Sequence, residues 1–121
     1  MTQQEMDELM RVWGREQRDK SIAVACLHAA RLDPGIAAAV HLRDLARWPD
    51  LRADCLRLRK VHQARDRAES RRMMGCLCRS GIAGRWDAQR MCAESAHRRR
   101  QWCRARVEQI RRDILSGDTT G

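Results

Sequence analysis

The stretch Cys76–Cys103, CLCRSGIAGRWDAQRMCAESAHRRRQWC, holds four of the six cysteines of this 121-residue chain. At its centre, residues 80–84 (SGIAG) are small and predict a turn. Beyond the turn, apolar residues recur at steps of three and four, the spacing of one helical face. Only Arg99 interrupts this face, which carries Cys92, Ala96, Cys103, Val107, Ile110 and Ile114.

A similar stripe precedes the turn. It starts with Leu51, Cys55, Leu58 and His62, meets the charged residues Arg65 and Glu69, and recovers at Met73 and Cys76. The two stripes predict one helix over residues 51–78 and another over residues 86–115. Joined by the turn, they form a helical hairpin with sulfur on its facing sides.

Residues 1–50 predict further helices. Thr2 and Glu5 have the spacing of a capping box, Gly14 weakens the first helical pattern, and Ser21 begins a second one. Asp33-Pro34-Gly35 predicts a break, a helix follows over residues 36–47, and Pro49 disfavours helix at Trp48.

The expected fold is therefore all-α and extended rather than compact. Its three parts are an N-terminal helical segment (residues 1–50), the cysteine-bearing hairpin (residues 51–115) and a flexible tail (residues 116–121).

The charge is concentrated in the second half of the chain. The formal net charge is +9, and the whole excess lies in residues 55–121. A basic half of this kind can bind nucleic acid, anionic lipid or an acidic protein. Arg outnumbers Lys by 23 to 2 and Asn is absent, which a GC-rich coding sequence also produces. We expect Arg98, Arg99 and Arg100 to meet carboxylates or lipid headgroups of neighbouring subunits.

The composition also predicts a protein partner. The chain has no Phe or Tyr, so it lacks most of the large side chains that dominate core energetics. The acidic start (Glu5, Asp7, Glu8) fits neither a signal peptide nor a cleaved mitochondrial presequence. The longest apolar run, residues 22–27, is too short to span a bilayer.

The cysteines suit a disulfide better than a metal site or catalysis. Cys76, Cys78, Cys92, His97 and Cys103 lack the short two-to-four-residue spacing of zinc knuckles. Cys92 and His97 lie about 140° apart around a helix, and no third group orients them. Helices that flank a short turn bring Cys78 and Cys92 to one level, so we expect these two to be bonded. No catalytic, cofactor or metal site is predicted.

The hairpin resembles the coiled-coil-helix–coiled-coil-helix (CHCH) family of small mitochondrial proteins, above all its member in respiratory complex I. Arg65-Asp66, Cys78-Arg79, Trp86, Cys92, His97 and Cys103 stand where that pattern has its conserved types. Ala68 replaces the first cysteine of the pattern, the turn is about three residues longer, and the spacing from Cys92 to Cys103 is one residue longer than in the family. The resemblance therefore implies the Cys78–Cys92 disulfide, with Cys103 free or paired with Cys76.

The resemblance implies a non-enzymatic accessory subunit of a mitochondrial membrane assembly, most closely complex I (NADH:ubiquinone oxidoreductase). It would lie on the intermembrane-space side of the inner membrane, bind larger subunits and lipid headgroups, and have no transmembrane span. The alternative is an Arg-rich RNA-binding component of a ribonucleoprotein such as a mitochondrial ribosome. A small bacterial or phage protein with reduced cysteines is a third reading.

Overall fold

The chain is all-α, as its sequence predicts. The computed structural model describes residues 1–80 and 85–120, without the side chains of residues 77, 78, 80, 85–88 and 118–120. Its elements are α1 (Gln3–Leu32), α2 (Gly35–Ala39), the 3₁₀ turn η1 (Leu42–Leu45), α3 (Pro49–Ser80) and α4 (Arg85–Thr120). No strand occurs in these residues. None of the helices described there has the length and apolar character that crossing a membrane requires.

Helix α1 begins at the predicted capping box. The Thr2 hydroxyl accepts the Glu5 backbone N–H at 3.2 Å, and the Thr2 N–H donates to the Glu5 carboxylate at 3.3 Å. The new helix predicted to start at Ser21 is wrong, because α1 continues unbroken to Leu32. A glycine inside a helix costs only about 1 kcal/mol, so Gly14 does not end a helix of this length.

The break after α1 lies where the sequence predicts it. Asp33 has extended backbone angles (φ −134°, ψ 95°), and its carboxylate accepts the Gly35 N–H at 3.1 Å. The side chain thus takes one backbone donor of the turn that opens α2.

The single helix predicted over residues 36–47 is wrong. Helix α2 ends at Ala39, and Val40 is extended (φ −83°, ψ 132°). The guanidinium of Arg59, on α3, donates to the Ala37 carbonyl at 3.0 Å and to the Val40 carbonyl. A tertiary contact therefore satisfies carbonyls at the end of α2 and stabilises the early stop.

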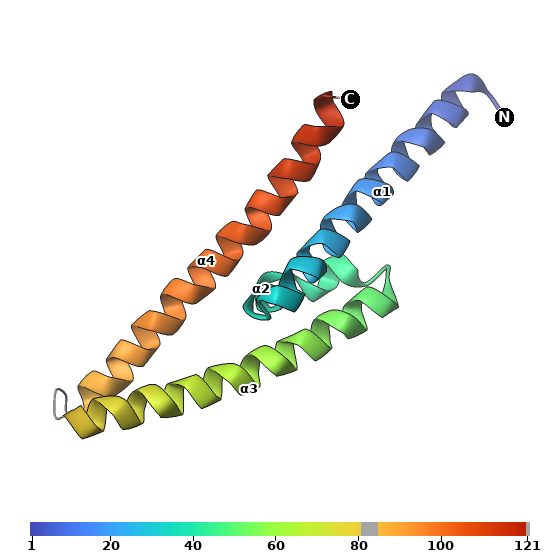
Figure 1. The fold of residues 1–121 in the computed structure, drawn as a ribbon. Helices are drawn as coiled ribbons and strands as arrows, with labels where there is room; N and C mark the ends of the chain where they lie inside the picture. The colour runs from blue at the N-terminus through green and yellow to red at the C-terminus, as the bar shows by residue number, and fades with distance from the viewer. Residues whose placement is uncertain (81–84, 121) are drawn as a thin grey trace.

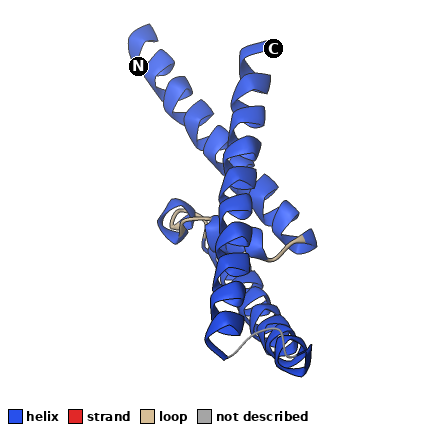
Figure 2. Cartoon of the chain, turned by 90° about the vertical axis from the view of Figure 1, so that its left-hand side faces the viewer, coloured by secondary structure: helices blue, strands red, loops and turns tan. Residues whose placement is uncertain are grey.

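Helices α3 and α4 diverge from the end of the molecule at which residues 81–84 connect them (Figure 1). Helix α2 and the second half of α1 occupy the angle between them, and both chain termini lie at the opposite end (Figures 1 and 2). The turn predicted over residues 80–84 falls almost wholly outside the described residues. Helix α4 extends to Thr120, which includes most of the residues predicted as a tail from residue 116.

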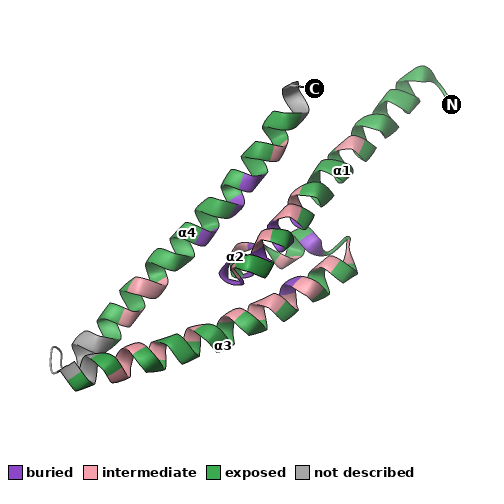
Figure 3. Ribbon diagram, viewed as in Figure 1, coloured by how far each residue is buried: buried purple, intermediate pink, exposed green. Residues whose placement is uncertain are grey.

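One core joins all parts of the chain. Its buried side chains come from α1, α2, η1, α3 and α4, so residues 1–50 and 51–115 share it. The buried residues cluster where these elements meet, and the described residues at the far ends of α1, α3 and α4 are exposed or of intermediate burial (Figure 3). The described core consists of Ala23, Cys26, Leu27, Ala30, Ile36, Ala37, Val40, Leu45, Cys55, Cys103, Val107 and Ile110.

Candidate functional site between α3 and α4

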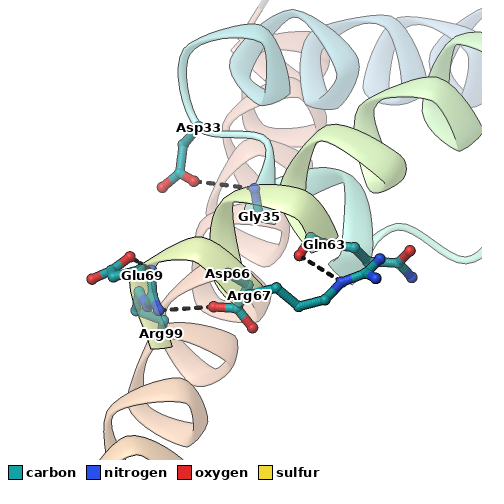
Figure 4. A network of polar contacts seen from close by, with 7 residues as sticks. All are labelled: Asp33, Gly35, Gln63, Asp66, Arg67, Glu69 and Arg99. Atoms are coloured by element: carbon teal, nitrogen blue, oxygen red, sulfur yellow. Dashed lines mark hydrogen bonds and ion pairs between the residues drawn. The ribbon is translucent and has the colours of Figure 1, made fainter. Parts of the chain in front are cut away.

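Three charged residues form a polar crossing between α3 and α4. Arg99 donates from Nη2 to Asp66 Oδ1 and from Nη1 to Glu69 Oε2, both at 2.8 Å (Figure 4). Asp66 and Glu69 are three residues apart and share one face of α3, so one guanidinium reaches both. All three side chains are a third to a half exposed, which limits the strength of the pairs.

The structure separates the three arginines predicted to contact a partner. Arg99 is engaged within the chain, and Arg98 and Arg100 are exposed. Neither Arg98 nor Arg100 has an ion-pair partner in the described part of the chain. Arg98 and Arg100 are thus available to a partner, and Arg99 is a structural residue.

Beside the polar crossing lies a cavity of about 330 Å³, here called the α3/α4 cavity. Its walls come from the turn before α2, from the middle of α3 and from the middle of α4. Charged and aromatic side chains line it on the helix sides, among them His62, Arg65, Arg100, Trp102 and Arg104.

The described cysteines carry free thiols. Cys76 is exposed, Cys92 is half-buried, and Cys26, Cys55 and Cys103 are buried. The bond between Cys76 and Cys103 is absent, because Cys103 faces the core rather than the end of the hairpin. Its sulfur lies 3.0 Å from where a Cβ on Gly35 would stand. Cys92, the described member of the predicted Cys78–Cys92 pair, has a free thiol in this structure. The side chain of Cys78 lies outside the described residues, so the disulfide stays a prediction that peptide mapping must test.

The buried thiols are held in their neutral form. Desolvation raises the pKa of Cys26, Cys55 and Cys103 above the ordinary thiol value, and Asp33 raises that of Cys103 further. A thiol with a raised pKa is a poor nucleophile, because the thiolate is the reactive form. Among the described residues, no group of three or more His, Cys, Asp or Glu side chains is placed to hold a metal ion.

A second surface stands out on the first half of α1. Met6, Leu9, Met10 and Trp13 share one side of the helix, and each is 48–62% exposed. We call these four residues the α1 apolar face. Close to Trp13, Ile114 of α4 borders a shallow groove between the two helices. The face is therefore left uncovered by the rest of the described chain.

The sequence shows that charged residues interrupt the apolar stripes of the two long helices, but it does not show that these residues contact one another. In the sequence, Glu69 only interrupts one apolar stripe, and Arg99 interrupts the other and belongs to the arginine cluster expected to contact a partner. The structure shows that the interruptions face each other and that Asp66 joins them. Arg59, Arg65, Trp102 and Arg104 gave no signal as site residues, because their roles depend on which elements pack beside them.

Comparisons with known proteins identify no family. No protein-family model matches this chain, and neither curated proteins nor solved structures gave a match. The functional argument therefore rests on the residues and their geometry.

Proposed function

We propose that this protein is a non-enzymatic structural subunit of a larger protein assembly. The observation that carries the proposal is the uncovered α1 apolar face. Amphipathic helices bind partner proteins by placing an apolar face with this spacing against a hydrophobic groove. In the second half of the same helix, Ala23, Cys26, Leu27 and Ala30 are buried by the chain itself. The first half of α1 has the same spacing of apolar residues, but the rest of the described chain does not bury them.

The small core supports the same proposal. Six of the twelve described core residues are alanine or cysteine, and none is aromatic. Burial of such small side chains gives limited hydrophobic stabilisation. A short chain with so modest a core gains stability when a partner covers more of its apolar surface.

The charges beside the α1 apolar face indicate what the partner carries. Glu5, Asp7 and Glu8 lie in the first turns of α1, whereas Arg11 and Arg15 follow. Glu8 and Arg11 pair with each other at 3.1 Å, but both side chains stay about two-thirds exposed and accessible to a partner. A partner helix that matches this order presents basic residues to the start of α1 and acidic residues further along.

The assembly we propose is mitochondrial, with respiratory complex I on the intermembrane-space side of the inner membrane as the first candidate. The support for this part of the proposal is the residue pattern of the CHCH family over residues 65–115. The described ones among these residues, 65–80 and 85–115, lie in the second half of α3 and in α4.

The test is assembly in mitochondria. Wild-type chain and a variant with Leu9→Gln, Met10→Gln and Trp13→Gln are expressed with the same tag, and native electrophoresis follows their incorporation into complex I. We expect the wild type to migrate with the complex and the variant as a free subunit.

The control replaces Val12 and Val24, two other exposed apolar residues of α1, with Gln. Far-UV circular dichroism checks that every variant keeps its helices. Assembly of the triple variant at the wild-type level would refute the role of the face. A wild-type chain absent from complex I, but dependent on the face in another complex, would refute only the mitochondrial assignment.

A second candidate function, RNA binding in a ribonucleoprotein such as a mitochondrial ribosome, is favoured by another observation. Arg98, Arg100 and Arg104 are exposed on α4 and have no ion-pair partner in the described chain. Unpaired arginines on one helix are suited to phosphate contacts.

Titration with RNA at about 150 mM salt tests the second function. The informative variant is Arg98→Gln with Arg100→Gln, because replacing Arg99 would also break the polar crossing. Submicromolar binding that this variant loses would favour the RNA-binding function over the structural one. Weak binding that does not change in the variant would count against it.

A further inference from the structure

The α3/α4 cavity has a defined position in the fold. It lies between the turn that opens α2 and the middle turns of α3 and α4, next to the polar crossing. Its volume of about 330 Å³ is at the lower end of the range for small-molecule sites, roughly 300–1,000 Å³. A ligand no larger than a mononucleotide matches this size better than a larger cofactor does.

The carboxylates around the cavity are already engaged. Asp66 and Glu69 accept from Arg99 at 2.8 Å, and Asp33 accepts the Gly35 N–H at 3.1 Å. Arg99 balances one of the two negative charges of Asp66 and Glu69, and Asp33 keeps its charge while it accepts a neutral N–H. The positive charge that an anion needs must therefore come from the other arginines of the cavity.

The other arginines of the cavity have no such partner. Arg65 of α3 and Arg100 and Arg104 of α4 line it, and none makes a hydrogen bond or ion pair within the described residues. Arg100 and Arg104 are four residues apart on one side of α4, a spacing at which like charges repel. An anion between the two helices would relieve this repulsion.

The cavity also has an aromatic wall. Trp102 lines it and is 55% exposed, so part of the indole is accessible to a ligand. Around α4, Trp102 lies on one side of Cys103 and Arg104 on the other, each about 100° away. The aromatic ring and the arginines thus border different edges of the cavity.

We infer that the α3/α4 cavity binds a small organic phosphate that carries an aromatic ring, the chemistry of a nucleoside monophosphate. The phosphate would be held by Arg65, Arg100 and Arg104, and the ring would stack on Trp102. A phosphate offers three strong acceptor oxygens and more than one negative charge, so it can pair with several guanidinium groups. A carboxylate is satisfied by one bidentate arginine. This site is separate from the α1 apolar face and does not depend on the proposed assembly.

Isothermal titration calorimetry on the full chain tests the inference. The probes are adenosine monophosphate, adenosine and inorganic phosphate at low salt. We expect the nucleotide to bind with a submillimolar Kd and each fragment to bind at least about tenfold more weakly. The variant Arg100→Gln/Arg104→Gln should weaken nucleotide binding by about tenfold or more, and Trp102→Leu should do the same.

Arg106→Gln is the matched control, because Arg106 is an exposed arginine of α4 that does not line the cavity. It should leave the Kd within about twofold. If the double variant fails to fold, Arg65→Gln tests the same phosphate contact from α3. Three results would overturn the inference: no nucleotide binding at millimolar concentration, equal affinity for inorganic phosphate and nucleotide, or an equal loss in the Arg106 control.

Discussion

Arg99 of α4 and Asp66 of α3 form an ion pair across the hairpin, with 2.8 Å between Nη2 and Oδ1. The Glu69 carboxylate accepts a hydrogen bond from the second nitrogen of the same guanidinium, Nη1, also at 2.8 Å. Arg99 and Glu69 each lie where apolar packing would otherwise continue along the helix, and Asp66 lies beside Glu69. The two interruptions therefore meet at one level and fix how α3 and α4 are aligned, since a shift along either helix would separate the charges.

Replacing Arg99 should destabilise the fold modestly. We expect Arg99→Gln to lower the free energy of unfolding by about 1 kcal/mol, because the pair is partly exposed and screened by solvent. Urea denaturation followed by far-UV circular dichroism measures the change. Arg98→Gln, the neighbouring exposed arginine, should change it by less than about 0.5 kcal/mol.

A double-mutant cycle with Asp66→Asn separates the ion pair from other effects of losing Arg99. The coupling energy should shrink as salt is raised, because salt screens exposed pairs. A cycle with no coupling at low salt would show that the crossing does not contribute to stability.

Gly35→Ala should destabilise the protein although alanine is the better helix former. A Cβ at this position would lie 3.0 Å from Cys103 Sγ, 3.2 Å from Asp33 Oδ1 and 3.3 Å from His62 Cε1. We expect a loss of about 1–3 kcal/mol from overpacking. Thermal and urea unfolding measure it, and the loss should be smaller when Cys103→Ala is already present.

Gly14→Ala is the matched control for the previous prediction. A Cβ there meets nothing within 4 Å, and the residue lies inside α1. The substitution should stabilise the protein by up to about 1 kcal/mol. Destabilisation at both positions would mean that overpacking at Gly35 is not the cause.

The thiols should differ sharply in reactivity. In the native protein, an alkylating reagent should modify Cys76 first, because it is exposed. Cys26, Cys55 and Cys103 should stay protected until the protein unfolds, because burial blocks access and raises the pKa of each thiol. Peptide mapping by mass spectrometry gives the order, and fast modification of the buried three would contradict the core described above.

The same peptide map tests the Cys78–Cys92 disulfide predicted from the sequence. If the bond forms, both residues are alkylated only after reduction, even in the unfolded protein. Its loss should then cost roughly 2–4 kcal/mol. Alkylation of both in the native, unreduced protein would refute the bond.

Stability should fall in alkaline solution because of the buried thiols. Their pKa is raised above 9.0 in the folded protein, so the unfolded chain releases these protons first. Their contribution is complete below about pH 9 and is lost as the pH rises through the folded-state pKa values.

The measurement is the urea midpoint from pH 7 to pH 10.5, with reductant present. A variant with Cys26, Cys55 and Cys103 replaced by alanine should show a shallower decline, whatever its absolute stability. The background is small, because the chain has no tyrosine and its only lysines are Lys20 and Lys60. Equal slopes for the two proteins would refute the role of the thiols.

The sequence by itself determined the fold class and some of the element boundaries, among them the start of α1 and the break after it. Helical periodicity, the Thr2 capping box and the break at Asp33 are local signals, since each depends on residues within a few positions of one another. The same signals placed Cys103, Val107 and Ile110 on the buried side of the last helix, where the structure has them.

Only the tertiary structure decided which elements of the chain pack against each helical face. Helix α2 stops at Ala39 because Arg59, twenty residues later, donates to its last carbonyls. Arg99 changes from an interruption into a link between helices because Asp66 and Glu69 lie opposite. Cys103 meets Gly35 instead of another cysteine because α2 lies between α3 and α4. These contacts join residues far apart in the chain, and periodicity within one helix carries no information about which element packs against it.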